Sequence, residues 1–317
     1  MHVLFLFLDG VGIGKKDAAA NPFFAARIPV LEILLGGTLP SLHHRTIETA
    51  ETTALPLDAT LGVEGLPQSG TGQASLFTGI NAPLLVGKHF GPYPYSTLRP
   101  MIEAHNIFRR VLQVGLRPCF ANAYPQKFFD YVETRQSRLT VTTLSCKYAG
   151  LPLRREKELS EGRGISADIT REGWFKLGHP SIAVISPDVA GIHLAGLCVD
   201  YEFVLFEYWK TDHAGHGQGM AEAVDALERF DGLLGGMLAT VDRHRTLVVL
   251  TSDHGNLEDL TTKTHTRNPV PLILTGKRHR AVADRVYHYG GRAPNLTHVL
   301  PALMEVLQDD AGRGGHS

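Results

Sequence analysis

The sequence predicts an α/β fold, in which a largely parallel sheet carries helices on both faces and a small cap is inserted into the core. Three observations support this prediction. Short apolar runs recur along the chain, amphipathic helical patterns lie between them, and a charged segment of weak periodicity interrupts the series. Continuous apolar runs are typical of strands buried on both faces, because helices cover both sides of a parallel sheet.

Five apolar runs, each bounded by polar residues or glycine, predict the buried strands. They are Val3–Leu8, Ile182–Ile185, Phe203–Tyr208, Thr246–Thr251 and Val270–Leu274. Runs this short are typical of strands, whereas buried helices need longer apolar stretches.

Two helices have clear sequence signals. One is predicted over Met220–Val241, because apolar residues recur there on one stripe at helical spacing. A closing helix is predicted over Leu296–Leu307, with Asn295 as its N-cap. Pro301 must then lie near the first turn or kink the helix, since proline lacks a backbone N–H.

The segment 125–180 differs from the rest of the chain. It is rich in charge, is interrupted by Gly150, Gly162 and Gly164, and has weak periodicity. We interpret it as a small inserted cap that covers a site on the core, which then consists of residues 1–124 and 181–317. An ordinary surface excursion is the alternative.

Composition excludes several classes of protein. The 317 residues carry 31 Lys plus Arg against 32 Asp plus Glu, so no basic surplus favours nucleic acid or an anionic membrane. No apolar run approaches the roughly 20 residues that span a bilayer. Three widely spaced cysteines without a CxxC pair fit a reducing compartment, and we expect a cytoplasmic protein. The 16 histidines raise the question of metal binding, because histidine is the commonest metal ligand.

Polar residues follow the first predicted strand, at the edge where open α/β sheets place their sites. Asp9 is followed by Gly10, Gly12 and Gly14, a G-x-G-x-G spacing and not the G-x-G-x-x-G of dinucleotide loops. A carboxylate repels a pyrophosphate unless it holds a metal ion. Asp9 is therefore interpreted as a metal ligand, with the dinucleotide loop as the alternative.

The segment Gln68–Gln73 is dense in Gly, Ser and Thr, and it can present a hydroxyl at a helix start. Ser69 and Thr71 are both candidate nucleophiles. A hydroxyl is a weak nucleophile until a base or a metal activates it, so a polar connector is the alternative for this segment taken alone.

Carboxylates and imidazoles follow the later strands. Asp212 and His216 are four residues apart, which places them on the same face of a helix. Asp253 and His254 follow the next strand, and His265 precedes the last one. Oxygen and imidazole donors suit divalent transition metals. Together these strand ends predict a two-metal site.

Five segments of the chain, in the order LFLDGVGIG, QSGTGQ, TDHAGH, SDHGN and HTRNPVP, resemble the alkaline phosphatase superfamily of metalloenzymes. Within it they are most similar to the branch of cofactor-independent phosphoglycerate mutases and phosphopentomutases. The resemblance implies two metal ions. One would be held by Asp9, Asp253, His254 and the nucleophile, and the other by Asp212, His216 and His265.

The nucleophile of this branch lies three residues before a glycine, so Gly72 indicates Ser69, with Thr71 as the second candidate. The mutases carry a histidine after that glycine, where this chain has Gln73.

The expected function is metal-dependent phosphoryl transfer on a small phosphomonoester, as a phosphohydrolase or phosphomutase with a phosphoserine intermediate. Oxygen and imidazole donors suit Mn²⁺ or Zn²⁺, and the resemblance to the mutases favours Mn²⁺. Lys210 and Arg267 are expected to pair with phosphate oxygens, and solvated surface charge is their alternative. The other functions considered are a phosphodiesterase or nucleotide pyrophosphatase, a non-catalytic metal- or phospholigand-binding protein, and a Rossmann oxidoreductase.

Overall fold

The computed structural model describes residues 1–134 and 138–314; residues 135–137 of the predicted cap and 315–317 lie outside this description. The strands are β1 (His2–Leu8), β2 (Ile47–Glu48), β3 (Thr52–Leu57), β4 (Pro118–Phe120), β5 (Phe203–Tyr208), β6 (Thr246–Thr251) and β7 (Val270–Gly276). The helices before the cap are α1 (Pro29–Leu34), α2 (Ser69–Thr78), α3 (Ala82–Val86), α4 (Arg99–His105) and α5 (Ile107–Gln113). Those that follow are α6 (Gln126–Glu133), α7 (Val141–Tyr148), α8 (Glu156–Ser160), α9 (Pro187–Gly196), α10 (Lys210–Gly217), α11 (Met220–Thr240), α12 (His279–Gly290) and α13 (Val299–Gly314).

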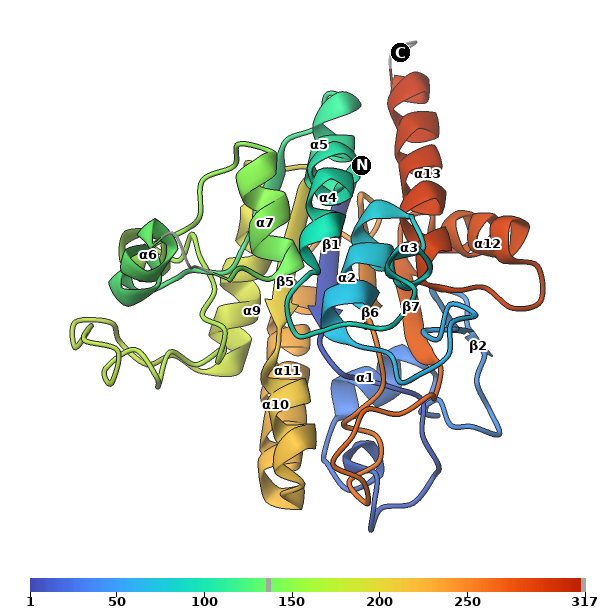
Figure 1. Cartoon of the computed structure of the whole chain (residues 1–317). Helices are drawn as coiled ribbons and strands as arrows, with labels where there is room; N and C mark the ends of the chain where they lie inside the picture. The colour runs from blue at the N-terminus through green and yellow to red at the C-terminus, as the bar shows by residue number, and fades with distance from the viewer. Residues whose placement is uncertain (135–137, 315–317) are drawn as a thin grey trace.

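The strands form one sheet in the order β2-β3-β7-β6-β1-β5-β4 (Figure 1). The pairs β6–β1, β1–β5 and β5–β4 are parallel, whereas β7, β3 and β2 are joined by antiparallel pairs. The predicted α/β class is confirmed, with a parallel centre. The run Val270–Leu274 is a strand, but it lies antiparallel to β6.

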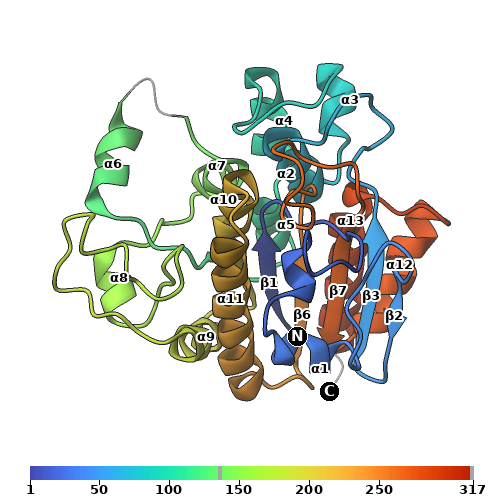
Figure 2. The ribbon, with the colours of Figure 1, turned by 90° about the horizontal axis from the view of Figure 1, so that it is seen from below.

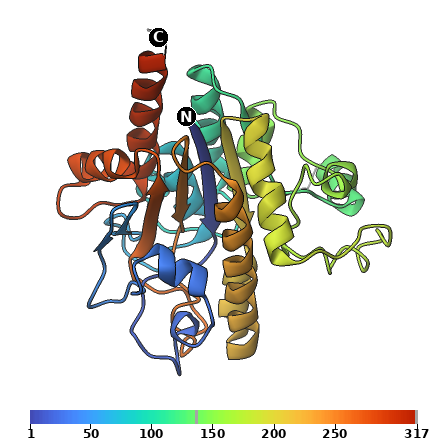
Figure 3. The ribbon, with the colours of Figure 1, turned by 180° about the vertical axis from the view of Figure 1, so that it is seen from behind.

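Side chains of the central strands alternate between two cores, because successive Cβ atoms point to opposite faces. Along β1, Val3, Phe5 and Phe7 enter one core, and Leu4 and Leu6 enter the other. Helices α2, α4, α5, α7 and α13 cover the first face (Figure 1). Helices α1, α9 and α11 cover the second face (Figure 3).

The prediction of a strand over Ile182–Ile185 is wrong. Ile182 is buried against Trp174 in a small separate cluster, while Val184 is 61% exposed. The chain then enters α9 at Ser186-Pro187, and Pro187 has no N–H to donate to a sheet. Ile182 is apolar because it packs in this local cluster, and the run forms no part of the sheet.

The C-terminal helix begins as predicted, with the Asn295 side chain accepting a hydrogen bond from the Thr297 N–H at 2.9 Å. A short 3₁₀ turn over Leu296–His298 precedes α13. Pro301 is the third residue of α13 and so lies in its first turn, where proline is tolerated.

The segment predicted as a cap has two parts. Helix α7 packs into the first core through Val141, Leu144 and Cys146. Leu159 and Trp174 belong instead to the small separate cluster, and α6 and α8 lie away from the sheet (Figure 2). We therefore group α7 with the core and restrict the proposed cap to the segments around it.

The N-terminal amine lies 2.7 Å from Asp310 Oδ2 in α13, so both chain ends meet at one end of the sheet (Figure 1). The carboxyl ends of the parallel strands lie at the other end. Within residues 1–134 and 138–314, no helix is long and apolar enough to cross a membrane.

Candidate metal centre

Three neighbouring parallel strands carry the predicted ligands to one edge of the sheet. Asp9 follows β1 directly, Asp253 comes two residues after β6, and Asp212 lies in the first turn of α10, just after β5. Because β1 lies between β6 and β5, their carboxyl ends meet at one place. His265 arrives on the long loop that leads into β7.

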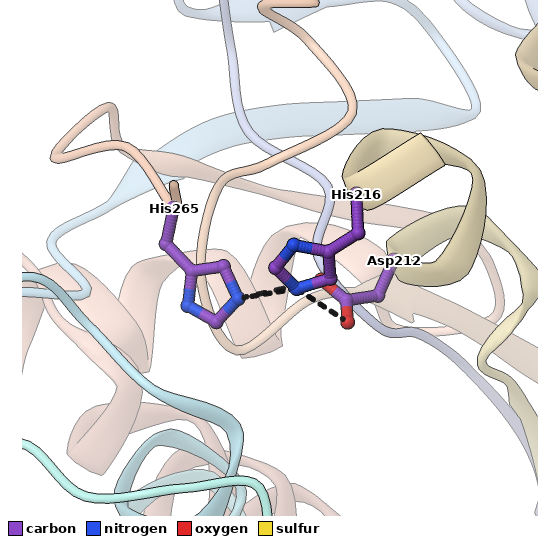
Figure 4. Close-up of side chains that lie close together, drawn as sticks. All are labelled: Asp212, His216 and His265. Carbon is purple, nitrogen blue, oxygen red and sulfur yellow. Dashed lines mark hydrogen bonds and ion pairs between the residues drawn. The ribbon is translucent and has the colours of Figure 1, made fainter. Parts of the chain in front are cut away.

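One group consists of Asp212, His216 and His265 (Figure 4). His216 Nε2 lies 3.1 Å from His265 Nε2 and 3.4 Å from Asp212 Oδ2. His265 Nε2 lies 3.6 Å from Asp212 Oδ1. One carboxylate and two imidazoles thus present their ligand atoms to a common point.

Backbone carbonyls determine which imidazole nitrogens are free. His265 Nδ1 lies 2.7 Å from the carbonyl oxygen of Pro67, and His216 Nδ1 lies 3.2 Å from that of Lys263. A carbonyl can only accept, so both Nδ1 atoms carry the proton. Each Nε2 then offers its lone pair to a metal ion, and the carbonyl fixes the orientation of the ring.

A second group consists of Asp9, Asp212 and His254. His254 Nε2 lies 3.3 Å from Asp9 Oδ1 and 3.6 Å from Asp253 Oδ2. Its ring stacks on that of His265 with centroids 3.9 Å apart. Asp212 belongs to both groups, so the two lie side by side.

The buried oxygens of the second group fit divalent cations. Asp9 Oδ1 and Asp253 Oδ2 are buried and accept no hydrogen bond. A buried carboxylate oxygen without a donor is costly unless a cation coordinates it. The oxygen and imidazole donors of both groups are those of Mn²⁺ and Zn²⁺ sites.

Burial sets the protonation of these residues. It raises the pKa of Asp9 and raises that of Asp253 well above its usual range. Burial opposes the charged form of His254 as well, but the charges of the nearby Asp253 and Asp9 carboxylates raise its pKa to about 10. Burial and the charge of His254 lower the pKa of His265 to about 4. His265 is therefore neutral at physiological pH, as a ligand must be, whereas His254 would have to release its proton when a metal ion binds.

Ser69 is the first residue of α2, and its Oγ lies 2.9 Å from His254 Nε2. Thr71 is engaged elsewhere, since its hydroxyl donates to the Gln68 carbonyl at 3.2 Å and accepts from the Phe90 N–H at 3.2 Å. The structure therefore brings Ser69, and not the Thr71 hydroxyl, to the second group. Gln73, which stands where the mutases carry a histidine, donates from Nε2 to Asp9 Oδ2 at 3.3 Å.

The two predicted phosphate-pairing cations lie in different surroundings. Arg267 Nε donates to the carbonyl of Gly65 at 3.0 Å, on the loop that leads to Ser69. Lys210 lines a cavity of about 440 Å³ between the end of β5 and the cap segments, with its Nζ 4.9 Å from the ring centre of Trp209. Their pairing with phosphate remains a prediction.

Sequence reasoning missed two residues that hold the ligands. Asn256 donates from Nδ2 to Asp212 Oδ1 at 2.7 Å, and Glu258 is 1% exposed beneath the ligand loops. In the sequence, the only indication of a role for either residue is its position just after Asp253-His254. Both lie several residues beyond the end of β6, so a rule that selects polar residues directly after strands does not select them.

Comparison with known proteins gives independent support for the family. The model of the Metalloenzyme superfamily matches residues 194–308, which include Asp212, His216, Asp253, His254 and His265. The 2,3-bisphosphoglycerate-independent phosphoglycerate mutase of Thermomicrobium roseum is 34% identical over 114 residues, 34% of this chain and 21% of the relative. That of Gloeothece citriformis is 33% identical over 118 residues, 34% of this chain and 22% of the relative. The matches thus span about a fifth of the length of these curated relatives.

Two solved structures share the fold over nearly the whole chain. The PH0037 protein from Pyrococcus horikoshii aligns with a TM-score of 0.58 at 16% identity, over 97% of this chain and 96% of its own. The alkaline phosphatase of the Antarctic bacterium TAB5 aligns with a TM-score of 0.53 at 12% identity, over 96% and 97%. The fold is therefore that of the alkaline phosphatases.

Proposed function

For this chain, which has the fold of the alkaline phosphatases and matches the Metalloenzyme superfamily over residues 194–308, we propose metal-dependent phosphoryl transfer on a small phosphomonoester. The observation that carries the proposal is the position of Ser69. Its hydroxyl lies 2.9 Å from His254, beside two adjacent ligand groups that share Asp212. A nucleophile beside a two-cation site is the arrangement that phosphoryl transfer requires.

The ligand assignment keeps the first group and extends the second by Asp253 and Ser69, while Asp212 belongs to both groups. Asp212, His216 and His265 would hold one divalent ion, and Asp9, Asp253, His254 and Ser69 would hold the other. When bound, such a pair neutralises the phosphoryl oxygens and stabilises both the attacking and the leaving oxygen.

The chain's own residues supply the nucleophile and orient the phosphate. A bond forms between Ser69 Oγ and phosphorus as the ester oxygen departs, which leaves a phosphoserine. Water or a second substrate hydroxyl then accepts the phosphoryl group. Ser69 begins α2, so the positive end of that helix faces the phosphate. Arg267 and Lys210 are proposed to pair with phosphate oxygens.

The cap segments bear on the choice between hydrolase and mutase. A mutase must retain its released intermediate until it is rephosphorylated, and the cavity of about 440 Å³ beside Lys210 is walled by cap residues such as Phe128 and Trp174. The named relatives are mutases, but they match only part of this chain. We keep hydrolase and mutase as one proposal, with phosphodiesterase as the alternative.

The proposal is tested by assaying p-nitrophenyl phosphate hydrolysis with Mn²⁺ or Zn²⁺. We expect Ser69→Ala to lower kcat by at least about 10³-fold, because removal of a nucleophile leaves only binding and electrostatic effects. Thr71→Val keeps the shape of the side chain and should retain activity if the fold is intact. Full activity in Ser69→Ala together with its loss in Thr71→Val would assign the nucleophile to Thr71.

A substrate panel separates the alternatives. Monoesters should be turned over faster than diesters. Release of inorganic phosphate indicates a hydrolase, whereas transfer to a second hydroxyl of the same substrate indicates a mutase. A chain that binds metal but turns over no ester would be a binding protein.

A further inference from the structure

Glu258 is a buried carboxylate that accepts four hydrogen bonds. Its Oε2 accepts from the Gly12 N–H at 2.9 Å and from the Asn256 N–H at 2.8 Å. Its Oε1 accepts from Asn268 Nδ2 at 3.1 Å and from the hydroxyl of Thr266. All four donors are neutral, so hydrogen bonds alone compensate the burial of this charge.

The donors come from two loops, and both carry proposed metal ligands. Gly12 lies three residues after Asp9, Asn256 lies two residues after His254, and Thr266 is adjacent to His265. The first loop follows β1, and the second joins β6 to β7 and contains Glu258 itself. One carboxylate therefore connects segments that are about 250 residues apart in the chain.

Three glycines make room for Glu258. A Cβ on Gly12 would lie 2.3 Å from Glu258 Oε1, and one on Gly255 would lie 2.4 Å from the same atom. A Cβ on Gly14 would lie 2.6 Å from the Glu258 carbonyl oxygen. These contacts are too short for any side chain. The glycines of the G-x-G-x-G segment thus admit a carboxylate, which removes the physical reason to regard that segment as a dinucleotide loop.

The connection extends to a third ligand-bearing segment through Asn256. Glu258 fixes the backbone N–H of Asn256, whose side chain donates to Asp212 Oδ1 at 2.7 Å and to the Asp212 carbonyl at 3.1 Å. Gly215 allows this approach, because a Cβ there would lie 2.7 Å from Asn256 Cγ. Hydrogen bonds through Asn256 therefore connect helix α10 to the Glu258 carboxylate as well.

We propose that Glu258 is a positioning residue that sets the separation of the two ligand groups, so that both ions can be held at once. This role depends on the metal centre proposed above. Glu258 acts through the loops and not by coordination, since its four hydrogen bonds direct its oxygens toward backbone and side-chain donors. Residues that orient metal ligands typically change metal affinity by about 10- to 100-fold when replaced.

The test measures Mn²⁺ binding to the full chain by calorimetry and by electron paramagnetic resonance. In Glu258→Gln, the amide NH₂ must face one of the two pairs of donors, so two hydrogen bonds are replaced by repulsion. We expect at least one ion to bind about tenfold more weakly or not at all. Glu258→Asp keeps the charge but is one methylene shorter, and it should also lose affinity.

Asp231→Asn is the matched control. Asp231 is likewise a buried carboxylate that accepts two backbone N–H groups, from Val30 at 3.1 Å and Leu31 at 2.8 Å, but it connects α11 to α1 and not to a ligand loop. We expect it to lower the Tm of the metal-free chain while the affinity for both ions stays unchanged. A merely structural role for Glu258 predicts the same outcome for both substitutions.

A milder variant keeps the test decisive if Glu258→Gln does not fold. Thr266→Val removes the hydrogen bond to Glu258 and the one accepted from the Asn268 N–H at 3.2 Å, without changing the shape of the side chain. It should weaken chiefly the ion held by His265. The proposal is overturned if the folded Glu258 variants or Thr266→Val bind two ions as tightly as the wild type. A wild-type chain that binds neither Mn²⁺ nor Zn²⁺ contradicts the proposed metal centre itself, and the positioning role with it.

Discussion

Asp212 differs from the other proposed ligands because it belongs to both groups. Oδ2 lies 3.4 Å from His216 Nε2, Oδ1 lies 3.6 Å from His265 Nε2, and the residue also groups with Asp9 and His254. We expect Asp212→Asn to weaken the binding of both ions, whereas His216→Gln should weaken only one. Metal stoichiometry measured after equilibrium dialysis distinguishes the two, and loss of a single ion from Asp212→Asn would contradict the shared role.

Glu207 is a second buried acid, at the end of β5. Burial raises its pKa from 4.5 to about 8, although its carboxylate accepts a hydrogen bond from Thr142 Oγ1 at 2.6 Å. As the pH rises, the unfolded chain loses this proton near 4.5 and the folded chain keeps it until about 8. The stability that the neutral carboxyl contributes is therefore complete below the lower pKa and is lost as the pH approaches the upper one.

Glu207→Gln should remove this pH dependence, since the amide is neutral at every pH and can still accept from Thr142. We expect the free energy of unfolding of the wild type to fall, relative to the variant, by on the order of a few kcal/mol between the two pKa values. Urea unfolding of both chains across that pH range measures the difference. Parallel curves would show that Glu207 is ionised in the folded chain.

Among the described elements, α9 and α11 have the most extensive contact, on the second face of the sheet (Figure 3). A Cβ on Gly191 of α9 would lie 2.0 Å from the Leu233 carbonyl oxygen of α11, so the two backbones are in direct contact there. We expect Gly191→Ala to force the helices apart at a cost of about 1–3 kcal/mol. Denaturant unfolding measures this loss.

Gly196, at the end of the same helix, is the control for that substitution. Its φ is −58° and a Cβ there would meet nothing within 4 Å. Gly196→Ala should be neutral or slightly stabilising, because alanine has the higher helix propensity. Equal losses in the two variants would mean that helix propensity, and not the close crossing, determines the effect.

A helix or strand is predictable from sequence where its hydrophobic pattern matches the position that the fold gives it. The predicted strands at β1, β5, β6 and β7 are confirmed, as is the long helix α11. The strand β3 was not predicted, and its Pro56 argues against a central position. It is accommodated because β2 pairs only with Thr53 and Ala54, so Pro56 lies beyond the last hydrogen bond on that side.

At the scale of the whole molecule, the proposed ions would join loops from both ends of the chain. Ligand binding to the folded state stabilises it, by roughly 2.7 kcal/mol when the free ligand is at 100 times its Kd. We therefore expect chelation to lower the Tm and added Mn²⁺ to restore it. Thermal unfolding followed by circular dichroism measures the change. A variant in which both Asp9 and His216 are replaced should show no change of Tm on chelation or on Mn²⁺ addition. If its Tm changes as much as that of the wild type, the ions bind elsewhere.

Much of the candidate site is visible in the sequence, because carboxylates and imidazoles directly follow buried strands. Asp9, Asp212, Asp253 and His254 could be selected in this way. The choice between Ser69 and Thr71 needed a resemblance to a family, since both hydroxyls lie in the same polar segment. Only the structure shows that the Thr71 hydroxyl is occupied by Gln68 and Phe90.

The sequence by itself determined the α/β class, the central strands and the ligand types, since hydrophobic periodicity and residue chemistry are local properties of the chain. Tertiary structure alone decided the antiparallel direction of β7 and the hydrogen-bond partners of Glu258. The physical reason is that these depend on distances between segments as far apart as Gly12 and Glu258, whose hydrogen bond spans 246 positions. A local sequence pattern cannot show that two such distant segments lie close together. They come into contact only when the strands that carry them pair into one sheet.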